Sequence, residues 1–170
     1  MHSRIFFVSD EPVTDTSDVL NASCIDYDYI SSRGYDYVDD SNLESDIEWL
    51  NGYLNVERCD VAGKNGETIP QYKITLNNRD ERIREVLTAT KALAADCVKQ
   101  VDDVLAKSGA LAYKDFLDVE MALYRLQHEW DDEFGIQFYY QDVFYSINEF
   151  LRINDERKEF YISGSLDYHF

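Results

Sequence analysis

Cysteine and long apolar runs are scarce in this chain. Its three cysteines, Cys24, Cys59 and Cys97, are widely spaced, and an odd number at such spacing does not form a disulfide framework. The apolar run at residues 5–8 has four members, whereas a secretory signal needs about 7–15 and a membrane span about 18 or more. We therefore expect a protein of the reducing cytoplasm, with no membrane partner.

Basic residues are also scarce. The 170 residues hold 34 aspartates and glutamates but only 16 lysines and arginines, so the formal net charge is −18. DNA, RNA and anionic membranes repel such a chain, and we expect it to bind no nucleic acid directly. A charge of this size destabilises a compact state. We therefore expect the protein to present its charge to a strongly basic surface.

Metal ligands are few and far apart. His2, His128 and His169 do not cluster in the sequence, and no two cysteines have the spacing of a zinc site. Segment 26–37 begins Asp-x-Asp, as a calcium-binding EF-hand loop does. Its fifth, sixth and twelfth positions lack the oxygen ligand, glycine and glutamate that this loop requires. We predict no metal and no other cofactor.

Catalytic motifs are missing as well. The Gly-Lys at residues 63–64 is not followed by the serine or threonine of a phosphate-binding loop, and the chain has no nucleophile elbow or kinase signature. Acidic pairs such as Asp102-Asp103 resemble the Mg²⁺ ligands of nucleases. Adjacent acids on a helix point apart, however, and no basic cluster is available for a nucleic-acid substrate. We predict that the protein is not an enzyme.

The composition nevertheless predicts a folded protein. Apolar residues make up 45% of the chain and aromatic residues 14%, with only two prolines and seven glycines, which is not the composition of a disordered acidic chain. We predict one compact α+β domain over residues 1–170, with short antiparallel strands and hairpins packed on a long central helix and two or three further helices. An alternative divides it into a β-rich acidic part, 1–76, and a helical part with C-terminal strands, 77–170.

Hydropathy patterns and turn residues predict the individual elements. Alternation with a period of two predicts a hairpin over residues 24–38, and Asn65-Gly66 predicts a second hairpin. Ser41 and Glu44 fit a capping box at the start of a helix. The predicted strands cover 4–9, 24–30, 35–38, 56–61 and 69–76, with two more within 159–170, and the predicted helices cover 42–54, 79–107, 114–134 and 141–153.

The negative charge is concentrated toward both ends of the chain. Residues 1–60 include 14 acidic and 3 basic residues, residues 61–110 include 7 and 8, and residues 111–170 include 13 and 5. A charge kept only for solubility has no reason to avoid the middle, so we expect both acidic regions to contribute to one binding face. The predicted partner-binding residues are Asp26, Asp28, Asp36, Asp39, Asp40, Glu44, Asp46, Glu48, Glu129, Asp131, Asp132 and Glu133.

Several of these residues carry a local energetic cost. On a strand over 25–30, Asp26 and Asp28 would share a face about 6.6 Å apart, a spacing similar to that of neighbouring phosphates in nucleic acid. Glu44 and Glu48 repel each other at i,i+4 of a helix, and the acids at 129–133 oppose a helix dipole. Such costs are expected at functional sites. The alternative is a solvated acidic face that nearby arginines or lysines neutralise.

By charge and composition the whole chain resembles the acidic antirestriction and anti-CRISPR proteins of phages and plasmids, without sharing a motif. The resemblance implies an inhibitor that acts in a bacterial cell. It would mimic nucleic acid and block the basic groove of a CRISPR effector or restriction enzyme. One alternative is an immunity protein or antitoxin that neutralises a basic nuclease toxin. Another is a non-inhibitory module that forms a homodimer through the 79–107 helix.

Overall fold

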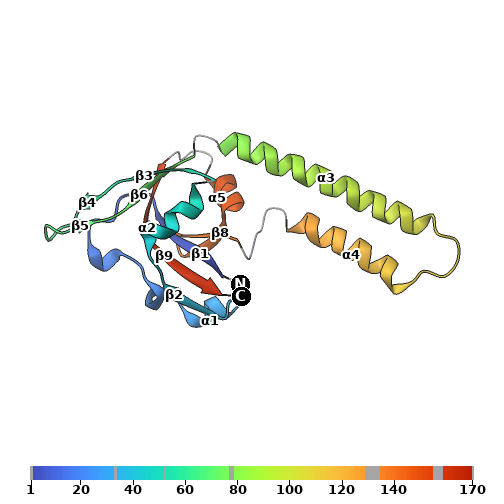
Figure 1. The fold of residues 1–170 in the computed structure, drawn as a ribbon, viewed down its shortest axis with the longest axis horizontal. Coiled ribbons are helices and arrows are strands. Elements are labelled where there is room, and N and C mark those ends of the chain that lie inside the picture. Colours follow the sequence, from blue (N-terminus) through green and yellow to red (C-terminus); the bar gives the residue numbers. More distant parts are fainter. Residues whose placement is uncertain are drawn as a thin grey trace.

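The structure is a computed structural model that describes residues 2–32, 34–51, 53–76, 79–128, 135–154 and 159–169. It has a body built on one large sheet and an arm of two helices that projects from this body (Figure 1). The predicted α+β class is confirmed. The sheet unites strands that precede the arm in sequence with strands that follow it.

One long strand, β9, organises the sheet. It pairs antiparallel with β1 on one side, and with β6 and then β2 on the other. β1 also pairs in parallel with β7, and a tight turn with positive φ at Gln141 and Asp142 joins β7 to β8. The strands are β1 (His2–Ser9), β2 (Tyr37–Asp40), β3 (Asn55–Arg58), β4 (Val61–Ala62), β5 (Thr68–Ile69), β6 (Tyr72–Thr75), β7 (Gln137–Tyr140), β8 (Val143–Ser146) and β9 (Glu159–His169).

Short helices cover both faces of this sheet. Ile5, Phe6, Phe7 and Val8 of β1 are therefore all buried, although alternate residues of a strand point to opposite faces. The helices are α1 (Tyr27–Ser32), α2 (Leu43–Asp46), α3 (Arg79–Leu105), α4 (Tyr113–Gln127) and α5 (Ile147–Ile153), with single 3-10 turns at η1 (Thr16–Asp18), η2 (Ala22–Cys24) and η3 (Ile47–Leu50).

The body has one hydrophobic core on each face of the sheet. The larger core contains residues of η3 and α5, and the ring of Phe150 meets those of Phe138 and Phe160 with centroids 4.9 Å apart. The smaller core contains Ile30 of α1 and Tyr168 of β9. Neither described core contains a residue of α3 or α4. The body therefore does not use the arm to fill its interior.

The arm consists of α3 packed against α4. The 27 residues of α3 extend roughly 40 Å at about 1.5 Å per residue. Arg79 at the start of α3 donates from Nε to the carbonyl oxygen of Leu151 in α5 at 2.7 Å. Arg82 donates from Nε to Oδ1 of Asn148 at 3.4 Å. Beyond these first turns α3 leads away from the sheet (Figure 1).

The predicted hairpin over 24–38 is wrong. Residues 27–32 form helix α1, and Oδ1 of Asp26 accepts from the backbone N–H of Asp28 at 2.8 Å. An aspartate that accepts from the first helical N–H groups stabilises a helix start, and here this effect outweighs the alternating pattern. Asp26 and Asp28 therefore do not share the face of a strand. Residues 37–40 do form a strand, β2, but its partner is β9.

The other predicted elements are confirmed in part. The hairpin at Asn65-Gly66 joins β4 and β5, with φ +86° at Gly66, and continues as the pairing of β3 with β6. The helix predicted at 42–54 is α2 followed by η3, and its cap is Asn42, whose side chain accepts from Ser45 N, in place of Ser41. The helices predicted at 79–107 and 114–134 correspond to α3 and α4. Residues 129–134 lie outside the described residues.

The C-terminal region differs more. The helix predicted at 141–153 begins only at Ile147, because Ser146 and Glu149 form a capping box there. The residues just before it form strand β8. The two strands predicted within 159–170 are one continuous strand, β9. Among the described residues, none of the helices has the length and apolar character to cross a membrane.

Candidate protein-binding interface

Strand β2 is an open edge of the sheet in the described part of the chain, because it pairs only with β9. Asp39 and Asp40 lie on this edge and are exposed. Edge strands commonly carry charges, which prevent pairing with another chain. This protective role would explain Asp39 and Asp40, but it does not explain the exposed acidic residues that lie near β2 on other segments. We use the term β2 surface for the seven exposed carboxylates around this edge: Asp26, Asp28, Asp36, Asp39, Asp40, Glu44 and Glu48.

The carboxylates of the β2 surface come from segments that pack on opposite faces of the sheet. Helix α1 packs on one face through Ile30, and it carries Asp28 on its exposed side. The α2–η3 segment packs on the other face through Ile47 and carries Glu44 and Glu48. The carboxylates therefore surround the β2 edge from both sides. That these residues bind a partner stays a prediction, and the strand predicted for Asp26 and Asp28 is wrong.

Hydrogen bonds divide the β2 surface into two groups. Four members have partners. Asp26 and Asp40 accept hydrogen bonds from the backbone N–H groups of Asp28 and Ala22. Asp36 lies 3.0 Å from Nδ1 of His169, and Glu44 lies 2.8 Å from Arg58. The other three accept no hydrogen bond and form no ion pair with any residue that the structure describes. These three are Asp28, Asp39 and Glu48.

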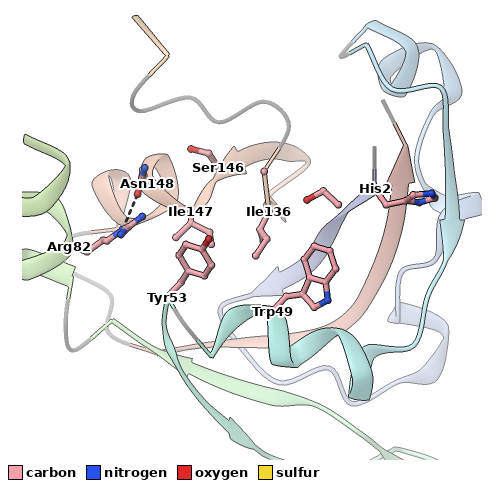
Figure 2. Close-up of a pocket in the computed structure, with 10 residues that line it drawn as sticks. His2, Trp49, Tyr53, Arg82, Ile136, Ser146, Ile147 and Asn148 are labelled. Atoms are coloured by element: carbon pink, nitrogen blue, oxygen red, sulfur yellow. Dashed lines mark hydrogen bonds between the residues drawn. The ribbon is translucent and has the colours of Figure 1, made fainter. Parts of the chain in front are cut away.

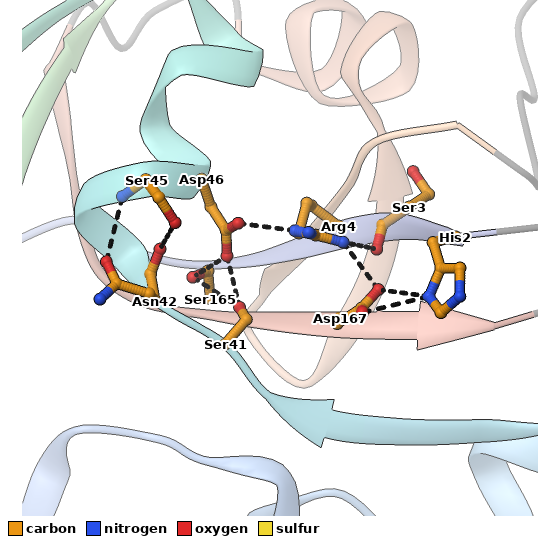
Figure 3. Close-up of polar contacts among 9 residues, drawn as sticks. All are labelled: His2, Ser3, Arg4, Ser41, Asn42, Ser45, Asp46, Ser165 and Asp167. Carbon is orange, nitrogen blue, oxygen red and sulfur yellow. Dashed lines mark hydrogen bonds and ion pairs between the residues drawn. The ribbon is translucent and has the colours of Figure 1, made fainter.

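Asp46 does not belong to this surface. Its side chain is 4% exposed, and its Oδ1 lies 2.7 Å from Nε of Arg4. Its Oδ2 accepts from the hydroxyl groups of Ser41 and Ser165, and Arg4 also contacts Asp167 at 2.7 Å (Figure 3). The prediction that Asp46 binds a partner is therefore wrong, because this carboxylate is used inside the body to neutralise a mostly buried arginine.

An aromatic and histidine row lies beside this buried network. His2, Tyr37 and His169 are cross-strand neighbours on β1, β2 and β9, and the rings of Tyr37 and His169 stack with centroids 5.3 Å apart. His2 also contacts Asp167 (Figure 3). Tyr37 is 41% exposed and adjoins the β2 surface, and tyrosines beside carboxylates are good interface anchors. The alternation around residue 37 was the signal that could have identified it.

Three cations of the body, Arg58, Lys64 and Lys73, form ion pairs within the part of the chain that the structure describes. Arg58 contacts Glu44 and Asp60, and Lys64 contacts Asp15. The hydrogen bond to Asp60 raises the pKa of Arg58 above its usual value. Lys73 lies between Glu159 and Glu57, and the charges of these two glutamates raise its pKa. These three cations are therefore engaged with other carboxylates and form no ion pair with Asp28, Asp39 or Glu48 among the described residues.

The second predicted cluster, Glu129, Asp131, Asp132 and Glu133, lies outside the described residues. The tyrosines that follow it mainly fill the core. The ring of Tyr139 packs against Phe7 and Phe144, and the buried Tyr140 donates from its hydroxyl to Asp10 at 3.1 Å. Tyr139 and Tyr140 therefore contribute mainly to the interior of the body.

A pocket of about 360 Å³ lies where the arm meets the body (Figure 2). Trp49 and Tyr53 line it and are 43% and 40% exposed. Arg82 reaches it from α3, with its guanidinium carbon 5.5 Å from the centroid of the Tyr53 ring. Ile136 and Ile147 add apolar surface. Its lining suits a planar or anionic group, which aromatic faces and a guanidinium can hold together.

No three histidine, cysteine, aspartate or glutamate side chains of the described residues are grouped so that they could hold a metal ion. Comparisons with protein-family models, with curated proteins and with solved structures found no match.

Proposed function

We propose that this protein is a non-catalytic inhibitor whose β2 surface mimics nucleic acid and occupies the basic groove of a nucleic-acid-binding protein. The observation that carries the proposal is the gathering of seven exposed carboxylates around one open sheet edge, while an eighth, Asp46, is buried. The expected targets are CRISPR effectors, restriction enzymes or nuclease toxins, because their grooves carry arginine and lysine for phosphate.

The electrostatics support a basic partner. Residues 1–78 and 129–170 together hold 25 acidic and 8 basic residues, a net charge of −17. Fixed carboxylates of this density attract a cationic surface and accelerate its association. Asp28, Asp39 and Glu48 are available for new ion pairs because they have no partner among the described residues.

The distribution of the carboxylates favours a mimic over an immunity protein. An inhibitor shaped to one nuclease active site needs one compact acidic patch. A mimic of nucleic acid needs an extended band, because phosphates follow one another along a groove. The carboxylates of the β2 surface come from several segments on both faces of the sheet, and we take this spread as support for a band.

Affinity capture with matched baits tests this proposal. One bait carries Asp28→Asn, Asp39→Asn and Glu48→Gln. The control bait carries Glu57→Gln, Asp60→Asn and Glu159→Gln, which remove the same charge from the β3–β6 side of the sheet. We expect mass spectrometry to identify a basic nucleic-acid-binding protein that the wild-type and control baits retain and the first bait loses. Salt at about 300–500 mM should release it.

Inhibition assays on the captured protein then complete the test. We expect the wild-type protein to block its nucleic-acid binding, and the β2-surface variant to inhibit at least about tenfold less, because each lost ion pair is worth roughly 0.5 kcal/mol or more. The proposal is wrong if both baits capture the same proteins equally, or if salt does not weaken the complex. Protection of one nuclease toxin alone, without competition against nucleic acid, would favour the immunity protein.

A further inference from the structure

The long helix of the arm has two parallel rows of side chains at heptad spacing. The inner row lies on the face that is buried or half-buried, and the outer row follows it by one residue. A row with alternating steps of three and four residues is the pattern that packs against another helix. The inner row is Ile83, Val86, Thr90, Leu93, Cys97, Gln100 and Val104, and the outer row is Leu87, Lys91, Ala94, Val98, Val101 and Leu105.

The outer row is largely exposed although it is mostly apolar. Leu87, Val98 and Leu105 are 52%, 62% and 76% exposed. Helix α4 repeats this arrangement. Phe116 and Leu123 are exposed, and each lies one position after a residue of the more buried row that includes Val119 and Ala122. A helix with apolar residues on more than its packed side requires a further partner.

The exposed rows of the two helices form one surface. Val101 and Leu105 of α3 and Phe116 of α4 line a common apolar groove of about 220 Å³ between the helices. We use the term arm face for Leu87, Val98, Val101, Leu105, Phe116 and Leu123. At 38% to 76% exposure, these six side chains present on the order of 500 Å², since one fully exposed side chain of this size presents roughly 150–200 Å².

We propose that the arm face binds the arm face of a second copy of this chain, with the two arms antiparallel in a four-helix bundle. Two such faces together bury on the order of 1,000 Å² of apolar side chain, and their polar borders add to it. The total approaches the roughly 1,200–2,000 Å² of a stable interface. A two-fold axis across the middle of the outer row would place Leu87 opposite Leu105 of the second copy, and Ala94 opposite Val98.

The charge distribution favours a second copy in this orientation. Residues 79–128 hold nine acidic and eight basic residues, whereas the body carries a net charge of −17. The arm is therefore the one large part of the chain on which two copies can meet without strong repulsion. An antiparallel pair separates the two bodies by roughly the length of α3, about 40 Å, which is several Debye lengths at physiological salt. A parallel pair would bring the bodies together.

Sedimentation equilibrium at about 1–100 µM tests the dimer. We expect the wild-type protein to be dimeric over most of this range. Val98→Glu with Leu105→Glu should raise the dissociation constant at least a hundredfold. Ala92→Glu with Ala95→Glu adds the same charge at exposed positions off both rows and should leave the dimer intact. Circular dichroism must show the same helix content in both variants, since arm-face residues contribute little to the interior.

Two measurements test the orientation and the independence of this inference. Spin labels at Lys107, near the tip of the arm, should lie more than about 30 Å apart in an antiparallel dimer. Short label distances would overturn the antiparallel arrangement. A wild-type monomer at every concentration, or an unaffected Val98→Glu/Leu105→Glu dimer, would overturn the interface. The β2-surface variant should remain dimeric, because its substitutions lie outside the arm face. The dimer test therefore gives the same result whether or not the proposed inhibitory function is correct.

Discussion

Replacing Asp46 with asparagine should destabilise the body and leave the β2 surface unchanged. Asp46 is 3% exposed and receives hydrogen bonds from Arg4, Ser41 and Ser165. Removing one member of a buried ion pair generally costs about 3–5 kcal/mol. Arg4 keeps its contact with Asp167 at 2.7 Å, and asparagine keeps one acceptor oxygen. We therefore expect a loss of about 2–3 kcal/mol.

Urea unfolding followed by circular dichroism measures this loss directly. In a thermal scan the midpoint should fall by about 5–10 °C, because 1 kcal/mol corresponds to about 2–4 °C in a protein of this size. Asp39→Asn is the matched control. Asp39 is exposed and lies opposite Asp167 on β9, so its replacement relieves a like-charge contact and should change the free energy of unfolding by no more than about 0.5 kcal/mol.

A double variant distinguishes a lost ion pair from lost packing. Arg4→Met with Asp46→Leu removes both charges, and apolar replacement of a buried pair is often close to neutral. We expect it to recover most of the stability that Asp46→Asn loses. The reasoning is refuted if Asp46→Asn unfolds at the wild-type urea concentration. It is also refuted if Asp46→Asn and Asp39→Asn are equally destabilised.

Three further predictions concern the arm and the hairpin. Hydrogen bonds from Lys107 and from the backbone N–H of Ala112 lower the pKa of Asp115 below its usual 3.8. The stabilising effect of this carboxylate is therefore present above pH 3.8 and is lost as the pH falls through the lowered pKa. The carboxyl ¹³C shift of Asp115 should titrate with a midpoint below 3.8, and a higher midpoint would contradict this. Arg79→Ala should cost about 1–2 kcal/mol in urea unfolding, because a charged donor to a buried carbonyl is lost; no change would mean that this contact does not hold the arm. Gly66→Ala should cost about 1 kcal/mol by the same assay, because alanine is strained at positive φ, whereas Gly66→Asn should cost less.

Local signals in the sequence were sufficient where one short segment determines its own structure. Asn65-Gly66 specifies a tight turn because these residues tolerate positive φ, and the hairpin is present. The apolar periodicity likewise predicted a helix over 79–107, which α3 forms over Arg79–Leu105, and the outer row is part of this periodicity. The partner of the outer row is the face of another helix, and no local sequence pattern can identify that face.

Long-range pairing explains the errors at β2 and β9. Strand β2 pairs with β9 more than a hundred residues away, so the sequence around it suggested a nearer partner. The two strands predicted within 159–170 require a turn between them, but Gly164 lies within the continuous strand β9, opposite Phe7. A Cβ atom there would come within 3.0 Å of the Phe7 ring and of Leu20 O. This glycine therefore permits close approach inside a strand instead of ending one.

Asp46 illustrates how the candidate site could have been predicted better. It lies three residues after Leu43 and four before Leu50, so it occupies the apolar side of its helix, where an acid needs a partner. The helical periodicity thus distinguishes the buried Asp46 from the exposed Glu44 and Glu48, whereas composition alone cannot distinguish them. The same criterion applies to the arm, where exposed apolar residues need a partner just as a buried acid does. An antiparallel dimer would satisfy them and present two β2 surfaces at opposite ends, which would strengthen binding to a partner with two basic grooves.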